Sequence, residues 1–204
     1  MEEVKLSCFK MIPVKFDQLL LSNMGFVILL KDEEKDRTLP IFIGTVEARA
    51  IILHVNKIEV PRPLTHDLLK NILEHMECRV NRVEVSELRE GTFFARLVLE
   101  QDGVEMPIDS RPSDAIALAL RFGAPIFVAE EVMDEAAHTS VEFEAAKAAA
   151  SQGEESDENE GNKKATPLDV LKLDLEQAVA EERYEDAARL RDEIKRLEEK
   201  HTDN

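Results

Sequence analysis

Apolar residues in the first part of the chain fall into short runs that are separated by charged or turn-forming segments. Residues 24–30 and 39–43 are two such runs, with the charged segment 31–37 between them, which predicts a hairpin of two buried strands. Residues 45–57 place apolar side chains on almost every side, as expected of a largely buried helix. Strands and helices are therefore predicted within one folded unit.

A second helix and a three-stranded meander are predicted next. Prolines at positions 61 and 63 are followed by Thr65, which we expect to cap a helix. The predicted inward face of this helix consists of Leu68, Leu69, Ile72, Leu73 and Met76. Three strand-like segments come after it, and the turn Asp102-Gly103 between the last two favours an antiparallel arrangement. The three segments are residues 80–88, 93–99 and 104–108.

A very apolar helix follows the meander. Ser113 is predicted to cap residues 115–122, Gly123 to end the helix, and residues 125–128 to form a short strand. Strands joined as hairpins, with helices in separate blocks, are typical of an α+β fold. We therefore expect a largely antiparallel mixed sheet with packed helices.

The chain divides into three regions. Residues 1–135 are predicted to form the α+β domain, and residues 136–165 an acidic flexible linker, because they contain few large apolar residues. Residues 166–204 begin with a helix-start pattern in which Thr166 is the cap and Pro167 the first helical residue. Apolar residues then recur at spacings of three and four, which predicts two helices that fold back on each other as a hairpin. These residues are Leu168, Leu171, Leu175, Ala178, Ala187, Leu190, Ile194 and Leu197.

The chain is acidic throughout. Its formal net charge is -17, which divides into -8 for residues 1–135, -4 for residues 136–165 and -5 for residues 166–204. Affinity for nucleic acid usually depends on a positive surface that neutralises phosphates. This composition therefore argues against tight, general binding of DNA or RNA.

The sequence predicts a cytoplasmic protein that does not span a membrane. The uncharged stretch Gln18 to Leu30 falls short of the roughly 20 apolar residues that a bilayer helix needs. The amino terminus shows no secretory signal pattern. Cys8 and Cys78 have no neighbouring cysteine or metal-spaced histidine, so we expect both to be reduced, mostly buried thiols.

Residues 181–194 resemble the UVR motif, which occurs in subunits of the excision-repair nuclease and in some chaperone-protease and kinase-activator proteins. The resemblance covers about the last 35 residues and implies a helical hairpin that docks against another protein. The residues expected to bind this partner are Tyr184, Ala187, Ala188, Arg191 and Ile194. The alternative is an ordinary amphipathic hairpin that packs on its own domain.

Three blocks of the larger domain resemble the bifunctional nuclease domain family. They are residues 39–44 with Glu47 and Ala48, residues 62–68, and residues 108–119. The resemblance implies an α+β domain that commonly self-associates, hence a homo-oligomer, and that cleaves both DNA and RNA.

The same blocks contain the residue types that phosphodiester hydrolysis needs. Such a site stabilises the phosphate charge and activates a water, with carboxylate-bound Mg²⁺ or Mn²⁺ or with a histidine base. His66 is the candidate base, Arg62 and Arg111 are candidate phosphate clamps, and Ser113 lies at a helix start that suits an anion. The candidate carboxylates, for catalysis or for the metal, are Glu47, Asp67, Asp109 and Asp114.

Structural roles remain open for these same residues. Asp67 and Asp114 lie in first turns, where a carboxylate favourably meets the helix dipole. Arg62 and Arg111 can pair with Asp67 or Asp109 to fix the loops. The charge of -8 on residues 1–135 favours a second hypothesis, a non-enzymatic, self-associating scaffold or regulator that recruits a protein through its UVR hairpin.

Overall fold

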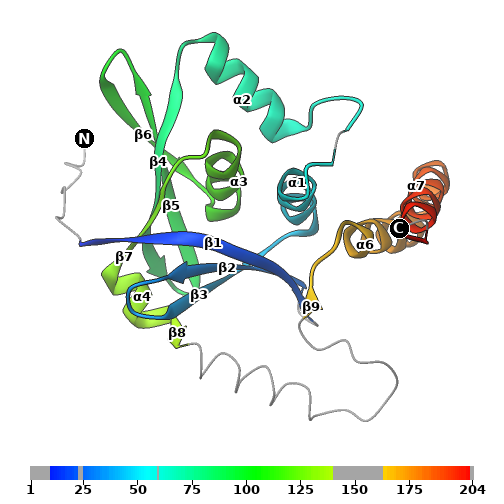
Figure 1. Ribbon diagram of the computed structural model, residues 1–204, viewed down its shortest axis with the longest axis horizontal. Helices are drawn as coiled ribbons and strands as arrows, with labels where there is room; N and C mark the ends of the chain where they lie inside the picture. Colours follow the sequence, from blue (N-terminus) through cyan, green and yellow to red (C-terminus); the bar gives the residue numbers. More distant parts are fainter. Residues whose placement is uncertain (1–9, 23–24, 59, 140–162, 203–204) are drawn as a thin grey trace.

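A computed structural model describes residues 10–22, 25–58, 60–139 and 163–202 (Figure 1). The strands are β1 (Met11–Ser22), β2 (Gly25–Asp32), β3 (Arg37–Ile43), β4 (Arg79–Arg89), β5 (Thr92–Gln101), β6 (Val104–Ser110), β7 (Ile126–Ala129), β8 (His138–Thr139) and β9 (Lys163–Lys164). The helices are α1 (Thr45–Val55), α2 (Thr65–His75), α3 (Pro112–Phe122), α4 (Glu130–Ala136), α6 (Pro167–Ala180) and α7 (Tyr184–Thr202).

The described strands form one mixed sheet in the order β6-β5-β4-β7-β1-β2-β3-β8, and β9 pairs with β1. Every pairing is antiparallel except that of β4 with β7. The predicted hairpin of β2 and β3 and the predicted meander of β4, β5 and β6 are both present. The structure therefore confirms an α+β fold with a largely antiparallel mixed sheet.

Strand β1 joins the two halves of this sheet and was not predicted from the sequence. Its first residues pair with β7 and its later residues with β2. A register shift between Phe16 and Gln18 interrupts the alternation, so that Leu19 and Leu20 are both buried. The resulting pattern matches neither a regular strand nor a helix, which is why the strand escaped prediction.

The core lies between the sheet and the two apolar helices α1 and α3, which pack against each other (Figure 1). Helix α3 also packs on β4 and β5. Its sequence is apolar around most of its circumference, so that Ile116, Ala117 and Leu118 are all buried. Gly123 ends the helix in the left-handed conformation (φ 66°), as predicted.

The predicted inward face of α2 is wrong. Among its apolar residues only Leu73 is buried, whereas Leu68, Leu69, Ile72 and Met76 are between 38% and 58% exposed. The reason is that the polar side of the helix faces the domain, where the side chains of His66 and Asp67 contact Asp114 and Arg121 of α3.

Two predicted helix caps are also corrected. Leu64 and Arg111 are the N-cap residues of α2 and α3, so Thr65 and Ser113 lie inside the helices. Pro112 fixes this boundary for α3, because proline is well suited to the first helical position. At the start of α2 the side chain of Asp67 accepts the backbone N–H of Leu64 at 3.0 Å.

The C-terminal hairpin is present and packs on the domain. Thr166 caps α6 as predicted, accepting the backbone N–H of Asp169. The backbone N–H of Ala165 donates to the carbonyl of Leu19 at 2.8 Å, and Val170 is part of the core cluster beside α1. In Figure 1 the hairpin therefore lies next to α1, with α7 on its outer side.

Several predictions fall in or near the proposed linker. Of residues 136–165, the end of α4 and the strands β8 and β9 are ordered against the domain, and residues 140–162 lie outside the described part. Cys8 also lies outside it, whereas Cys78 is a buried free thiol, as expected. Among the described residues, none of the helices is long and apolar enough to cross a bilayer.

Val170 provides a test of hairpin docking. Val170→Ala removes two buried methyl groups at the contact with α1 and should lower the free energy of unfolding by about 2 kcal/mol. Val179→Ala is the matched control, because Val179 lies on the same helix but is 51% exposed, and it should leave stability nearly unchanged. Urea denaturation of the full chain measures both, and equal effects of the two variants would contradict the docked arrangement.

Candidate functional site

Helices α1, α2 and α3 each carry a carboxylate at the third helical position: Glu47, Asp67 and Asp114. An acidic side chain is favourable there because it meets the positive end of the helix dipole. Two of the three, Glu47 and Asp114, are bridged by Arg111, whose nitrogens lie 2.7 Å from each carboxylate. The starts of α1 and α3 are thus joined by one guanidinium group.

His66 adds the start of α2 to this group. Its Nε2 atom lies 3.0 Å from Oδ1 of Asp114, and the imidazole is largely buried. When Nε2 donates its proton to Asp114, a neutral His66 presents Nδ1 as a proton acceptor. We call Glu47, His66, Arg111 and Asp114 the helix-start network.

The charges of the helix-start network do not cancel fully. With His66 neutral, one guanidinium faces two carboxylates, so the formal charge of the group is negative. Hydrogen bonds to Asp114 and then to Glu47 raise the pKa of Arg111 above its usual range, and the residue stays charged. The Arg111 side chain is 67% exposed, so part of its guanidinium is accessible to a ligand.

Gly44 leaves room for Glu47 to take its place in the network. A Cβ atom at position 44 would lie 2.5 Å from Oε2 of Glu47, which is too close for non-bonded atoms. A side chain at this position would require the flexible end of Glu47 to shift. The glycine at the start of α1 is thus part of the geometry of the site.

Asp67 belongs to a different set of contacts. The side chain of Arg121, only 2% exposed, donates to Oδ1 of Asp67 at 2.6 Å and to the carbonyls of Ala50 and Ala117. Burial raises the pKa of Asp67, but the hydrogen bonds from Arg121 and from the backbone of Leu64 outweigh it, and the net pKa is lowered. Oδ1 of Asp67 therefore links α2 to α3 through Arg121, and Oδ2 caps the start of its own helix.

The other predicted site residues are outside the contacts that define the network. Asp109 is exposed on β6, opposite Arg96 of β5, and Arg62 is exposed in the segment between α1 and α2. Ser113 is buried in the first turn of α3. The structure therefore brings together Glu47, His66, Arg111 and Asp114, and it does not bring Asp67, Asp109, Arg62 or Ser113 into the same contacts.

Two residues of the site region escaped the sequence analysis. Arg121 is the one charged residue in the apolar stretch 115–122, and such a residue must find a partner when it is buried. This pattern could have identified it. For Gly44 the only available signal was its position directly before a helix start.

The helix-start network does not fit a bound Mg²⁺ or Mn²⁺ as it stands. Arg111 occupies the position between the two carboxylates that a cation would take. Within the described ranges, no group of three or more His, Cys, Asp or Glu residues is placed to hold a metal ion. A metal requirement stays a prediction from the sequence.

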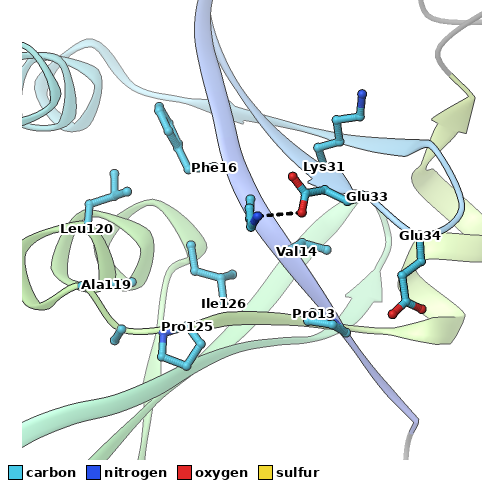
Figure 2. Close-up of a pocket in the computed structure, with 13 residues that line it drawn as sticks. Pro13, Val14, Phe16, Lys31, Glu33, Glu34, Ala119, Leu120, Pro125 and Ile126 are labelled. Atoms are coloured by element: carbon cyan, nitrogen blue, oxygen red, sulfur yellow. Dashed lines mark ion pairs between the residues drawn. The ribbon is translucent and has the colours of Figure 1, made fainter.

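A pocket of about 580 Å³ lies elsewhere on the domain (Figure 2). Pro13, Val14 and Phe16 of β1 form one side of it, and Leu120 at the end of α3 lies opposite. Its rim carries an ion pair of 2.6 Å between Lys15 and Glu33. The helix-start network lies at the other end of α3, so this mainly apolar pocket is separate from it.

The predicted partner-binding residues of the hairpin divide into two groups. Tyr184, Ala188 and Arg191 are exposed. Ala187 and Ile194 are buried in the hairpin. Only the first group is accessible to a partner in the docked arrangement.

Comparison with known sequences identifies the larger domain. Residues 28–141, more than half of the chain, match the sequence model of the bifunctional nuclease domain. The chain belongs to this family. Residues 166–200 match the UvrB/uvrC motif. Both resemblances derived from the sequence are confirmed.

Individual relatives cover parts of the chain. An uncharacterized protein of Mycobacterium tuberculosis is 43% identical over 110 residues, which are 54% of this chain and 65% of that protein. Bifunctional nuclease 1 of Oryza sativa subsp. indica is 27% identical over 183 residues, 82% of this chain and 53% of the relative. Bifunctional nuclease 1 of Arabidopsis thaliana is 27% identical over 177 residues, with coverages of 82% and 54%. The chain thus spans between about half and two thirds of the length of these relatives.

Replacing Arg111, the N-cap of α3, and Arg121, near the end of the same helix, should separate surface contacts from structural ones. Arg121→Met leaves Asp67 and the carbonyl of Ala50 without their donor and should cost about 2 to 4 kcal/mol of stability. Arg111→Met breaks exposed ion pairs and should cost less than about 1 kcal/mol. Urea denaturation measures both, and a larger loss for Arg111→Met would contradict these assignments.

Asp67 should make stability depend on pH. Because its pKa is lowered in the folded state, its contribution is present above the unfolded value, near 3.8, and is lost as the pH falls through the folded value. Asp67→Asn should therefore be less stable than the parent by about 1 to 3 kcal/mol at neutral pH. This difference should shrink in acid. Denaturation over a pH series measures it, with Asp109→Asn as the control for loss of a carboxylate at an exposed position.

Proposed function

We propose that this chain is a nuclease that hydrolyses phosphodiester bonds of DNA and RNA. The observation that carries the proposal is the helix-start network, which combines a histidine oriented by a carboxylate with an accessible arginine. Membership of the bifunctional nuclease domain family supports it, as do the plant relatives named bifunctional nucleases.

His66 is the proposed general base. Nε2 of His66 lies 3.0 Å from Oδ1 of Asp114, and in the tautomer that donates from Nε2 to this carboxylate, Nδ1 accepts the proton of the attacking water. Asp114 keeps the imidazole in this tautomer and stabilises the imidazolium that forms. The small exposed fraction of His66 limits the directions from which a water can approach it.

Arg111 is the proposed phosphate-binding residue. Glu47 and Asp114 fix the plane of its guanidinium and leave other N–H groups to bind a phosphate oxygen. The start of α3, of which Arg111 is the N-cap, adds a favourable field for an anion. Glu47 acts as a positioning residue, and Gly44 permits its position.

The acidic charge of the chain limits affinity for the substrate. A phosphate approaching Arg111 also meets the charges of Glu47 and Asp114, so tight binding of nucleic acid is not expected. This charge is also the observation that favours the second candidate function, a scaffold without enzymatic activity.

We further propose that the UVR hairpin binds a protein partner. The exposed residues Tyr184, Ala188 and Arg191 lie on α7, whose buried residues face α6. A partner can therefore reach them while the hairpin stays docked on α1. In the scaffold hypothesis this surface is the main functional site.

A nuclease assay with matched aspartate variants tests the proposal. The full chain should cleave single-stranded DNA and RNA, and Asp114→Asn should lower kcat/KM by about 10²- to 10⁴-fold, because His66 loses its orienting group. Asp109→Asn removes an exposed carboxylate outside the network and should keep the parent activity. Assays with a chelator, with Mg²⁺ and with Mn²⁺ test the predicted metal requirement in the same experiment.

The outcomes separate the two functions. If Asp114→Asn and the parent have equal activity, the reaction takes place at another site or is caused by a contaminant. A folded parent that cleaves neither substrate under any of these conditions would favour the scaffold.

A further inference from the structure

Another pocket, of about 330 Å³, lies between the end of α1 and the start of α2. This volume falls within the range of small-molecule sites, roughly 300 to 1,000 Å³. We call it the Val60 pocket. Its apolar lining is aliphatic and consists of Leu53, Ile58, Val60 and Leu64. Apolar side chains of this kind can hold a planar ring between them.

The polar groups of the Val60 pocket have defined hydrogen-bonding states. Nε2 of His54 lies 3.1 Å from the carbonyl oxygen of Leu120, which can only accept, so Nε2 carries a proton and a neutral imidazole leaves Nδ1 as an acceptor. Oδ1 of Asp67 accepts from Arg121, and Oδ2 accepts from the backbone N–H of Leu64. The carboxylate is thus already neutralised by a partner, whereas Nδ1 of His54 can accept a hydrogen bond from a ligand.

The Val60 pocket is locally positive in a strongly acidic chain. With His54 neutral, its lining has one more positive than negative charge. Arg62 adds a further positive charge, because it is exposed in the segment between two residues of the lining. Neither Lys57, which lines the pocket, nor Arg62 forms an ion pair with any residue that the structure describes. Both cations can therefore bind an anion without first losing such a partner.

The Val60 pocket and the helix-start network share the first turn of α2. Leu64 and Asp67 line the pocket, and His66 between them belongs to the network. Arg121 of the pocket and Asp114 of the network are seven residues apart on α3, which is about 10 Å along the helix axis. A short piece of single-stranded nucleic acid can span this distance.

We propose that the Val60 pocket receives one nucleobase of a single-stranded substrate, close to the bond that is cleaved. The aliphatic side chains contact the faces of the base, Nδ1 of His54 accepts from an N–H group on its edge, and Arg62 and Lys57 bind the adjoining phosphate. This inference rests on the proposed function for its class of ligand. A paired and stacked base cannot enter the pocket, so single strands should be preferred to duplexes.

Methyl NMR of the full chain tests the Val60 pocket without any turnover. Adenosine monophosphate should shift the methyl signals of the four aliphatic lining residues through the ring current of its base. The signals of Val55, which lies on α1 outside the pocket, should not move. A tetranucleotide with phosphorothioate linkages, which resist cleavage, should produce the same shifts. Absence of these shifts with the tetranucleotide would overturn the proposal, and shifts with adenosine monophosphate alone would assign the pocket to a free nucleotide instead.

Two variants separate the contribution of the base from that of the phosphate. Val60→Trp fills the pocket with an indole ring and should lower the affinity for adenosine monophosphate about tenfold or more. Val55→Trp is the matched control, because it adds the same ring at a 44% exposed valine of α1, and it should leave the affinity unchanged. Arg62→Met, at an exposed position, should weaken binding of adenosine monophosphate several-fold but not binding of adenosine, which has no phosphate.

Circular dichroism checks that each variant is folded. Equal losses of affinity in Val60→Trp and Val55→Trp would contradict a base in the pocket. An equal effect of Arg62→Met on adenosine and on adenosine monophosphate would contradict the proposed phosphate contact.

Cleavage of a strand with one abasic position distinguishes this proposal from the proposed function. The parent should cleave less well beside the abasic position than elsewhere, and Val60→Trp should remove this difference. A parent that cleaves both kinds of position equally would be a nuclease that does not use the pocket. A parent that cleaves neither would contradict the nuclease, and the NMR shifts with the tetranucleotide would then decide whether the pocket binds a base.

Discussion

The buried guanidinium of Arg121 fixes the relative positions of the three helices on which the candidate site is built. It is attached to α3, donates to the backbone of α1 and to its own helix, and pairs with Asp67 of α2. A buried charge is costly unless every donor has a partner, so these contacts are cooperative and tolerate little displacement. Without them α2 would have little reason to present its polar side to the domain, because its apolar side would then be the natural one to bury.

The helix-start network depends on this arrangement. Because α2 is held through Asp67, the neighbouring His66 reaches Asp114 on α3. The core packing of α1 against α3 places Glu47 within reach of Arg111. One helix start therefore carries the proposed base, another the proposed positioning carboxylate, and the third both the arginine and the aspartate that contacts the histidine. Structural and proposed catalytic contacts lie on adjacent residues of the same turn.

The periodicity of apolar residues predicted most of the helices and strands. Strand β1 and the orientation of α2 depend instead on contacts between distant parts of the chain. The β2–β3 hairpin, the meander and the apolar helices α1 and α3 have periodicities that directly identify them. Strand β1 lacks such a period because of its bulge, and the orientation of α2 depends on side-chain hydrogen bonds between residues about 50 positions apart. Likewise, the sequence supplied the residue types of the candidate site but could not tell that Asp114 would join His66 whereas Asp67 would join Arg121.

The docking of the hairpin against α1 has a consequence for competition between partners. The hairpin and α1 belong to the same chain, so their contact is intramolecular and acts at a high effective concentration. A protein that needs the buried side of α6, near Val170, must first displace that contact and binds more weakly as a result. A protein that uses the outer side of α7 faces no such competition. The docked hairpin therefore binds ligands on the outer side of α7 more readily than ligands that need the buried side of α6.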